Sequence, residues 1–335
     1  MSLVLGIETS CDETAASIVS SDKFIHSNVI WSQIAEHQPY GGVVPEIAAR
    51  SHLDMVDHVI KQALIDANKT LYDLDAIAVT SGPGLIGGLI VGLMSAKALA
   101  FALDKPLIAV NHLEGHALTA RLTSDLEFPF LLLLVSGGHT EILIATGVGE
   151  YIKLGGTIDD AIGEAFDKVA KMLGLNYPGG PEIEKIARNG DRNKYKFPRA
   201  LIDKSTYDFS FSGMKTAVKR TVDQSIIDDA SDIAASFEQA VTDIVINRMN
   251  NAIKFFKANY NGSKIIIAGG VASNLFLQTN LAKLAKHHEF ELIAPPLNLC
   301  TDNAAMIAWA GIERLNLGLT DSLEVAPRAR WKLYS

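Results

Sequence analysis

Two histidines stand four residues apart in the segment NHLEGHALTAR, at His112 and His116. On a helix, side chains four positions apart lie on one face, so both rings could ligate one divalent metal ion. A third ligand is needed, and the segment CTDN offers Asp302, with Asn303 beside it, as an oxygen donor from the far half of the chain. We therefore expect a metal site at His112, His116 and Asp302 that joins the two halves. Histidines at this spacing can also be satisfied by hydrogen bonds alone, so the pair by itself leaves both interpretations open.

Glu114 lies between the two histidines and raises the alternative of a metal-dependent protease. In the protease motif HExxH the acid follows the first histidine directly and reaches the metal-bound water. Here Glu114 comes two residues after His112, which is about 200° around a helix at roughly 100° per residue. Its carboxylate is therefore expected to point away from the metal face, and protease activity is the second choice.

Three glycine-rich turns could hold the phosphates of a nucleotide. The segment VSGGHT (135–140) offers consecutive backbone N–H groups without side chains, the arrangement of an anion-binding nest. In NYPGGPEIE (176–184) a proline begins a helix and two glycines let a ligand approach the backbone. AGGVASN (268–274) ends a buried strand and begins a helix near Asn274. Glycines at strand ends are often only turns, but three such turns in one chain favour a nucleotide site.

Acidic residues form two further groups. Asp160, Glu164 and Asp167 stand at positions i, i+4 and i+7, which is one stripe of a predicted helix. Asp167 could accept a hydrogen bond from a ribose hydroxyl or help to hold a metal; the plain alternative is a solvated helix face. Asp12 and Glu13 lie in the turn TSCDET, at the tip of a predicted hairpin. Carboxylates near phosphates can position a metal, a water or an amine nucleophile, so these two are the candidate catalytic residues.

The segment 185–204 differs from the rest of the chain, because it has seven basic residues against two acidic ones. Tyr195 and Phe197 lie among these cations, and this composition is typical of a surface that binds phosphates and stacks bases. A solvated loop is the alternative. The candidate RNA contacts are Arg192, Lys194 and Lys196.

The elements that must position these residues alternate between strands and helices. Short apolar runs predict strands, and the longer stretches between them predict helices. The predicted strands are 3–7, 77–79, 107–110, 130–135, 142–145 and 265–268, and the predicted helices are 47–67, 161–173, 181–189, 233–257 and 274–285. This alternation indicates an α/β protein with a central mixed sheet.

An internal repeat divides the chain. LVLGIETSCDETAASIVS and FLLLLVSGGHTEILIAT both consist of a strand, a polar turn and a returning strand. AIAVTSGPGLIGG and IIIAGGVASN are both a strand that runs into a glycine turn at a helix start. We therefore expect a duplicated fold that closes on a ligand in the cleft between its halves. The predicted lobes are 1–125, with a helical insertion at about 30–70, and 126–335, with an insertion at about 150–230.

Composition excludes several classes of protein. The 335 residues are 48% hydrophobic and 20% charged, which is typical of globular proteins and not of disordered or collagen-like ones. Thirty basic and 38 acidic residues give a net charge of −8, so any contact with nucleic acid must come from a local patch or a partner. Cys11 and Cys300 have no CxxC spacing, which argues against a disulfide framework and a zinc knuckle. The N-terminus lacks the basic start of a signal peptide, and we expect a cytoplasmic protein.

The apolar window 85–103 is long enough to span a membrane. It contains Gly87, Gly88, Gly92 and Lys97, however, and follows a Gly-Pro-Gly loop. We expect it to form a helix buried in a two-layer core rather than a membrane span.

Nine segments occur in this order along residues 3–331: GIETSCDET, GGVVPEIAAR, HLEGH, VSGGHT, AFDKVAKMLGL, YPGGP, FSFSGMKT, AGGVASN and CTDNAAMIA. Taken together, they resemble the bacterial TsaD family of tRNA adenosine threonylcarbamoyltransferases, once described as glycoproteases. The bacterial branch is indicated by GGVVPEIAAR. The resemblance implies the duplicated actin-like ATPase fold (ASKHA, ribonuclease H-like), with two lobes around a nucleotide cleft.

The resemblance also implies a reaction. Family members transfer a threonylcarbamoyl group from threonylcarbamoyl-adenylate to the exocyclic amine of adenosine 37 of tRNAs that read codons beginning with A, the adenosine just 3′ of the anticodon. The family's metal ligands fall on His112, His116 and Asp302, with iron as the usual metal and zinc as another. Contacts to the substrate or to an ATP-, ADP- or AMP-type nucleotide fall on Val135, Ser136, Gly137, Gly138, His139, Asp167, Gly180, Glu184 and Asn274. Many relatives have Asp where this chain has Glu184, so the geometry of that contact is expected to differ.

The implied partners are the small TsaB paralogue, the ATPase TsaE and the tRNA substrate, with no membrane. A non-catalytic nucleotide-binding scaffold is a third class of function, because actin-like folds also serve as regulators. The intact HLEGH and CTDN segments weigh against a scaffold, which has no need of a metal.

Overall fold

A computed structural model describes residues 1–224 and 229–334 of the chain. The chain forms two compact units: unit 1 contains Met1–Leu126 and Pro296–Ser335, and unit 2 contains Glu127–Pro295. The sequence had assigned the segment 296–335 to the C-terminal lobe. It belongs to unit 1 instead, because the helix α10 (Ala304–Asn316) packs against strands of the first sheet.

Unit 1 is built on a five-stranded sheet whose order is β3-β2-β1-β4-β5. The hairpin β1–β2 and its neighbour β3 are antiparallel, whereas β4 and β5 run parallel to β1. The strands are β1 (Leu3–Glu8), β2 (Glu13–Ser20), β3 (Ile25–Ser32), β4 (Ala76–Gly82) and β5 (Leu107–Asn111). All residues of β1, β4 and β5 are buried, so this part of the sheet is covered on both faces.

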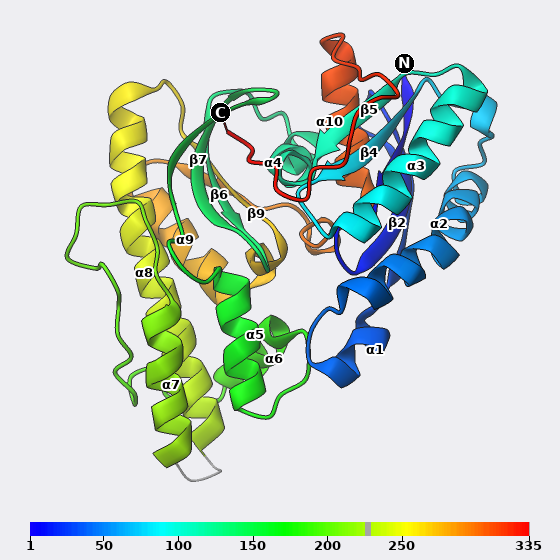
Figure 1. The fold of residues 1–335 in the computed structure, drawn as a ribbon. Helices are drawn as coiled ribbons and strands as arrows, with labels where there is room; N and C mark the ends of the chain where they lie inside the picture. Colours follow the sequence, from blue (N-terminus) through cyan, green and yellow to red (C-terminus); the bar gives the residue numbers. More distant parts are fainter. Residues whose placement is uncertain (225–228, 335) are drawn as a thin grey trace. The chain divides into compact units, whose positions relative to one another are not determined.

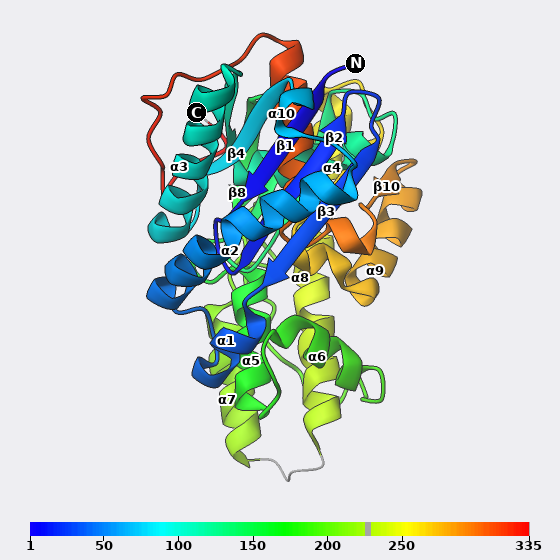
Figure 2. The same ribbon diagram turned by 90° about the vertical axis from the view of Figure 1, so that its right-hand side faces the viewer.

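Helices cover both faces of this sheet (Figures 1 and 2). Leu3, Leu5 and Ile7 of β1 join a core cluster with α2 and α3, and the alternate residue Gly6 packs tightly against the backbone of α10. Glu8 lies two residues after Gly6 in β1, so its side chain is on the same face of the sheet, the face that α10 covers. Helix α4 packs against α10 and therefore lies on this face as well. The helices of unit 1 are α1 (Ile34–His37), α2 (Pro45–Asp66), α3 (Ile86–Leu103), α4 (His112–Thr123) and α10, with short 3-10 turns η1 (Gln38–Tyr40), η2 (Leu71–Asp73) and η5 (Leu297–Leu299).

Unit 2 repeats the same sheet. Its order is β10-β9-β6-β7-β8, with β6, β7 and β8 antiparallel and β9 and β10 parallel to β6. The strands are β6 (Phe130–Val135), β7 (Thr140–Gly147), β8 (Glu150–Gly156), β9 (Lys264–Ala268) and β10 (Glu291–Ile293). Since β6–β10 correspond in order and direction to β1–β5, the duplication predicted from the sequence is confirmed.

The helices of unit 2 carry the other predicted residues. They are α5 (Ile162–Met172), α6 (Gly179–Ala187), α7 (Ser212–Gln224), α8 (Ala230–Asn259) and α9 (Leu275–His287), with the 3-10 turn η4 (Gly270–Ser273). Helix α5 packs against α6 and α7, and α8 packs against α6 and α9. The predicted strands and helices are all present, and most boundaries move by one to three residues.

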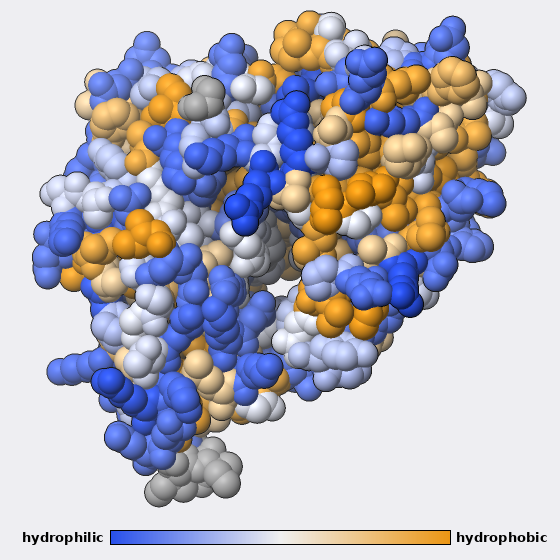
Figure 3. Space-filling view, viewed as in Figure 1, coloured by the Kyte–Doolittle hydropathy of each residue, from blue (hydrophilic) through white to orange (hydrophobic). Residues whose placement is uncertain are grey.

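The apolar helix α3 is only partly buried. Its buried face is formed mainly by Gly88, Leu89, Gly92 and Leu93, and Gly88 and Gly92 let it approach Thr9 closely. The opposite face exposes Ile86, Ile90, Met94 and Phe101 to solvent, and Figure 3 shows a hydrophobic patch over this helix. The prediction of a buried core helix is therefore right for one face only. By length and composition α3 is also the one helix among the described residues that could cross a membrane.

Candidate metal centre and ligand-binding turns

Helix α4 places both histidines at its start. Strand β5 ends at Asn111, whose side-chain oxygen accepts a hydrogen bond from Leu113 N at 2.9 Å and so caps the helix. His112 and His116 follow on one face, one turn apart, with ring centroids 4.8 Å apart. Both rings are buried, so their orientation is fixed by their neighbours and not by water.

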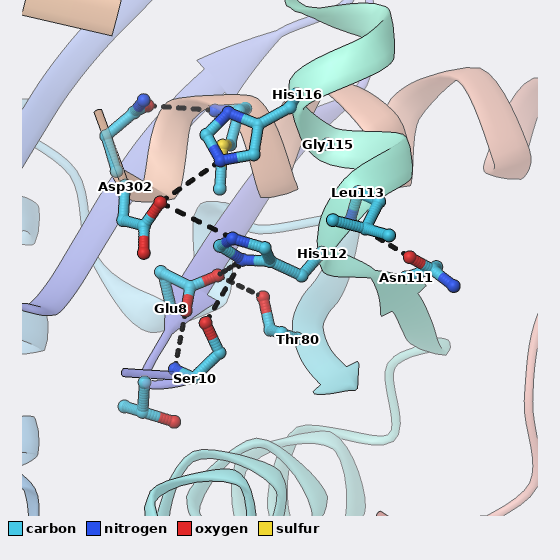
Figure 4. A network of polar contacts seen from close by, with 12 residues as sticks. Glu8, Ser10, Thr80, Asn111, His112, Leu113, Gly115, His116 and Asp302 are labelled. Carbon is cyan, nitrogen blue, oxygen red and sulfur yellow. Dashed lines mark hydrogen bonds and ion pairs between the residues drawn. The ribbon is translucent and has the colours of Figure 1, made fainter. Parts of the chain in front are cut away.

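Asp302 meets both rings from the loop before α10. Its Oδ1 lies 3.4 Å from His112 Nε2 and 3.1 Å from His116 Nε2 (Figure 4). The next residue, Asn303, caps α10 through a hydrogen bond from Met306 N, which holds the loop in place. The sequence analysis expected this site to join the two halves. Instead, all three residues belong to unit 1, because the segment 296–335 folds back onto the first sheet.

The spacing of the three ligand atoms fits a metal ion. One ligand atom from each residue lies within 4.8 Å of the other two. Ligands that sit about 2.0–2.2 Å from an ion in tetrahedral geometry are about 3.3–3.6 Å from one another, close to the two distances to Asp302 Oδ1. The cluster can therefore hold one divalent cation with little movement.

Glu8 fixes the orientation of the His112 ring. Its Oε2 lies 3.0 Å from His112 Nδ1 and accepts a hydrogen bond from the hydroxyl of Thr80, while its Oε1 accepts one from Ser10 N at 2.6 Å. An ionised carboxylate accepts only, so His112 carries its proton on Nδ1. In the neutral ring the Nε2 lone pair then faces Asp302 Oδ1, and two acceptors face each other unless a cation lies between them. This arrangement is the one by which carboxylates orient metal-ligating histidines.

The charges in this cluster are strongly coupled. Burial by itself lowers the pKa of His112, but the carboxylates of Asp302 and Glu8 outweigh burial and hold that pKa well above its usual value. Burial raises the pKa of Asp302, but His112 and His116 outweigh it and hold that pKa well below its usual range. The pKa of Glu8 is lowered as well, because His112 outweighs the effect of burial. Without a metal, the cluster thus stabilises a positive charge between its carboxylates.

The turn after β1 contains the two candidate catalytic carboxylates. Burial, together with the negative charges of Asp302 and Asp12, raises the pKa of Glu13 to about 10, and Asp12 and Glu13 share a hydrogen bond. Burial and Asp12 also raise the pKa of the Cys11 thiol, so this cysteine stays protonated and unreactive at neutral pH. Glu13 thus lies within electrostatic range of Asp302.

Glu114 does not belong to the metal cluster. Its buried carboxylate forms an ion pair with Arg314 of α10, which lies on another side of α4. The predicted direction of Glu114 is confirmed, and the base that a metalloprotease needs next to its metal is not supplied by this residue.

The turn after β6 is open and glycine-rich. Ser136 N donates to His139 O at 2.9 Å and His139 N donates to Ser136 Oγ at 3.1 Å, which closes the turn that follows Val135. Gly137 and Gly138 are exposed at its tip, and an added Cβ would meet nothing within 4 Å at either position. This backbone is therefore accessible to an anionic ligand.

The other predicted ligand contacts form two groups in unit 2. Asp167 accepts a hydrogen bond from Gly179 N at 2.7 Å, which joins α5 to the start of α6, and Gly180 follows with open space around it. Asn274 caps α9 by accepting from Leu277 N at 2.8 Å, and Glu184 accepts from Leu275 N at 3.3 Å. Asn274 and Glu184 thus meet at the N-terminal end of α9.

Of the acidic stripe on α5, two members are engaged with lysines. Asp160 pairs with Lys168 and Lys215, and Glu164 pairs with Lys168. The solvated-face alternative thus fits Glu164, whereas Asp160 is largely buried and its carboxylate is engaged by the two lysines.

The basic segment 185–204 is partly neutralised by acids of α8 and of the stretch before it. Arg192 pairs with Glu238 at 2.7 Å and lies over the ring of Phe276. Lys194 pairs with Asp229 and Asp232 at 2.6 and 2.7 Å. Tyr195 donates its hydroxyl to Asp229, and Lys196 is exposed. Acids thus pair with four of the seven cations, Arg188, Arg192, Lys194 and Arg199, whereas Lys185, Lys196 and Lys204 are exposed.

Glu8, Thr80 and Glu238 were not predicted from the sequence, although Glu8 contacts His112, Glu238 contacts Asn274, and Thr80 donates to Glu8. Glu8 ends an apolar strand, and an acid at that position of a buried strand is a signal that could have been used. Glu238 accepts from Asn274 Nδ2 and pairs with Arg192, and nothing local marks it, since it lies inside the long helix α8.

Comparisons with known proteins agree with the fold. Helices and sheets superimpose on the activator of 2-hydroxyisocaproyl-CoA dehydratase from Clostridium difficile, with a TM-score of 0.55 and 15% identity over 94% of this chain and 96% of that one. The ROK hexokinase from Thermus thermophilus gives a TM-score of 0.52 and 15% identity over 94% of this chain and 99% of that one. These likenesses show the actin-like ATPase fold and nothing finer.

The sequence comparisons identify the family. The proteins named tRNA N6-adenosine threonylcarbamoyltransferase from Brucella canis and Brucella suis biovar 1 are each 58% identical over 340 residues, which cover 98% of this chain and 95% of each relative. The family model for TsaD, tRNA N6-adenosine threonylcarbamoyltransferase, matches residues 24–309. The chain is therefore an enzyme of the transferase class and belongs to the TsaD family.

Proposed function

We propose that this chain transfers the threonylcarbamoyl group of threonylcarbamoyl-adenylate to the exocyclic amine of adenosine 37 in tRNAs that read codons beginning with A. Membership of the TsaD family supports the reaction class, and the buried cluster of His112, His116 and Asp302 is the single observation that carries its chemistry. In the reaction a bond forms between the amine nitrogen and the carbamoyl carbon, and the bond from that carbon to the phosphate oxygen breaks and releases AMP.

His112 Nε2, His116 Nε2 and Asp302 Oδ1 would hold one divalent metal, which we assign as iron, with zinc as the alternative that metal analysis would reveal. A bound divalent ion would supply Lewis-acid polarisation of the phosphate and carbamoyl oxygens. Glu8 keeps His112 in the tautomer that offers Nε2 to the ion.

The chain's own residues would orient the donor and accept the proton. The N–H groups of Gly137 and Gly138 would donate to phosphate oxygens, as their open turn allows. Val135, Ser136, His139, Asp167, Gly180, Glu184 and Asn274 would complete the contacts to the adenylate. An exocyclic amine is a poor nucleophile, so orientation and stabilisation of the developing oxyanion must do most of the work. We assign the amine proton to the Asp12–Glu13 pair, which already shares a hydrogen bond.

We also propose that the enzyme works in the cytoplasm with the TsaB paralogue and the ATPase TsaE as partners. The exposed apolar residues Ile86, Ile90, Met94 and Phe101 on α3 support a protein partner, because they form one unpartnered face of a helix.

The experiment is a direct transfer assay. The chain, with and without its partners, is mixed with threonylcarbamoyl-adenylate and unmodified tRNA, and the digested nucleosides are analysed by mass spectrometry. We expect threonylcarbamoyladenosine with the native chain and none with His112→Ala, whereas His58→Ala, which changes an exposed histidine of α2, is the matched control. If no product forms with partners and added iron or zinc, or if His112→Ala retains full activity without metal, the proposal is overturned.

A further inference from the structure

Near its C-terminal end the chain carries three exposed cations that form no ion pair with any acid the structure describes. Residues 325–334 (VAPRARWKLY) contain three basic residues and no acidic one. Arg328, Arg330 and Lys332 are all exposed, and within residues 1–224 and 229–334 no acid forms an ion pair with them. We call residues 325–334 the basic tail. In the segment 185–204, by contrast, acids pair with four of the seven cations.

The backbone of the basic tail is anchored on unit 1. Arg328 N donates to Ser81 O at 2.7 Å, and Gly84 N donates to Ala329 O at 3.3 Å. A Cβ on Gly82 would lie 1.9 Å from Arg328 O, so the loop between β4 and α3 fits closely against the tail. Figures 1 and 2 both show the tail, in red, running beside α3 and β4.

A second anchor joins the tail to the metal cluster. The side-chain nitrogen of Asn111 lies 3.3 Å from Trp331 O and 3.5 Å from Lys332 O. Asn111 is the cap of α4, and His112 is the next residue. The tail is therefore held at the start of the helix that carries both histidines, within the same unit.

The side chains of the tail are left free by these anchors. The anchoring bonds use backbone atoms of the tail, so they leave its cations available. The guanidinium of Arg328 lies 4.6 Å from the ring centroid of Trp331, a contact that holds the cation without using its N–H donors. Arginine presents those donors as a planar fork that matches a phosphate group.

We propose that the basic tail binds the phosphate backbone of the tRNA beside the adenosine that is modified. The inference rests on the proposed function and adds to it the place where the RNA is held. A chain with a net charge of −8 repels a polyanion overall, so binding requires a local group of free cations. The tail is such a group, and its anchor on Asn111 places it next to the cluster that the target amine must reach.

The test is the salt dependence of tRNA binding, measured with the partners present. The tail variant combines Arg328→Gln, Arg330→Gln and Lys332→Gln, which removes three charges and keeps every backbone anchor. The control combines Lys69→Gln, Lys254→Gln and Lys286→Gln, which removes three exposed charges elsewhere. We expect the tail variant to bind unmodified tRNA about tenfold or more weakly and to lower the slope of log K against log salt by about two to three, at roughly 0.7–0.9 per lost contact. The control is expected to keep the native slope.

A tail variant whose slope and affinity match those of the control overturns the inference, provided that both variants melt at the native temperature. If the native chain then still forms threonylcarbamoyladenosine, the proposed function stands without the tail. If tRNA binding depends on the tail but no modified nucleoside forms with native protein, the proposed function fails and the tail remains an RNA-binding element.

Discussion

The two units have the same sheet but opposite kinds of turn at the equivalent position. In unit 1, β1 and β2 pair up to Glu8 and Ala15, and the turn between them consists of buried side chains and carboxylates. In unit 2, β6 and β7 pair up to Val135 and Thr140, and the turn between them has two exposed glycines at its tip. One turn brings negative charge to a buried cluster, whereas the other offers bare backbone N–H groups.

Under the proposed function, this difference would give the two equivalent turns different roles in one reaction. A metal cluster gains from burial, because ligands fixed by neighbours need no rearrangement when the ion binds. A turn that contacts a substrate must stay accessible and free of side chains. The same hairpin serves both purposes because its ends are fixed by strand pairing while its tip is free to differ.

The largest expected effect comes from removing the charge at the centre of the unit 1 site. Asp302→Asn keeps the size of the side chain but takes away the negative charge that faces both histidines. We expect metal affinity to fall by more than about 100-fold, beyond the 10–100-fold typical of partners that only orient a ligand. Transfer activity should be lost with the metal. Metal content and isothermal titration measure the first effect, and Asp54→Asn on the exposed side of α2 is the control.

A smaller effect is expected when the residue that orients His112 is changed. Glu8→Gln replaces an acceptor of three hydrogen bonds with a group that has only one acceptor atom. The NH2 group of the glutamine side chain then points either at His112 Nδ1 or at Ser10 N. In both orientations His112 is no longer held in the tautomer that offers Nε2 to a metal. We expect metal affinity to fall about 10–100-fold, with a changed absorption spectrum of the cobalt-loaded protein.

Thr80→Val is the matched control for Glu8. It removes one hydrogen bond to the same carboxylate and leaves the contact between Glu8 and His112 in place. If Thr80→Val and Glu8→Gln weaken the metal equally, Glu8 has only a structural role.

The next largest effect is expected from a substitution in the open turn of unit 2. Gly138→Val places a branched side chain where an added Cβ meets nothing, so the fold should tolerate it, but the side chain would cover the N–H groups. We expect donor affinity to fall about tenfold, roughly the loss of one or two hydrogen bonds to a charged group, with unchanged metal affinity. Gly163→Ala is the contrast, because its Cβ would lie 2.6 Å from Ser136 O and should cost about 1–3 kcal/mol of stability. A Gly138→Val enzyme with native donor affinity would show that the turn does not contact the donor.

The sequence predicted best what depends on local spacing. His112 and His116 share a face because a helix brings residues four apart together, and the capping residue Asn111 was itself part of the motif. The glycine turns were found because strands end where apolar runs end. The duplication followed from the same patterns occurring twice, and both sheets have the predicted order of strand, turn and strand.

What failed depends on contacts between distant segments. The sequence placed Asp302 in the second lobe, since nothing local shows that 296–335 folds back onto β1 and β4. The sequence also does not show that Arg192 and Lys194 of the segment 185–204 are paired, because their partners Asp229, Asp232 and Glu238 lie more than thirty residues further on. It counted α3 as buried, because composition cannot tell one buried face from two.

The smallest expected effect is a pH dependence of stability that arises in unit 1 and not in unit 2. In metal-free protein the pKa of His112 lies well above 6.5, near which it titrates when unfolded. Its contribution to stability is therefore fully present below about pH 6.5 and is lost as the pH rises through the folded value. Asp302, whose pKa is lowered, contributes above about pH 4 and loses its effect only in acid. Between pH 7 and 9 two groups of the unit 1 site lower the stability as the pH rises: His112, and Glu13, whose buried carboxyl has a pKa raised to about 10 and so stays protonated only in the folded protein. We expect the metal-free protein to lose at least about 2–4 °C in melting temperature, the shift that about 1 kcal/mol gives in a domain of this size.

The variant His112→Asn tests where this dependence arises. It removes one of the two titrating groups, so the loss between pH 7 and 9 should be smaller than in the native protein, and what remains is the share of Glu13. Saturating metal should remove the share of His112 from the native protein as well, because a bound ion replaces the proton on the ring. Hydrogen exchange can follow the two sheets separately, and amides of β1 and β5 should open more easily at pH 9 while those of β6 and β7 keep their protection after correction for the intrinsic rate. Equal changes in both sheets would mean that the pH dependence does not come from the charged cluster of unit 1. The buried turn of unit 1 would then contribute no more to the pH dependence of stability than the open turn of unit 2.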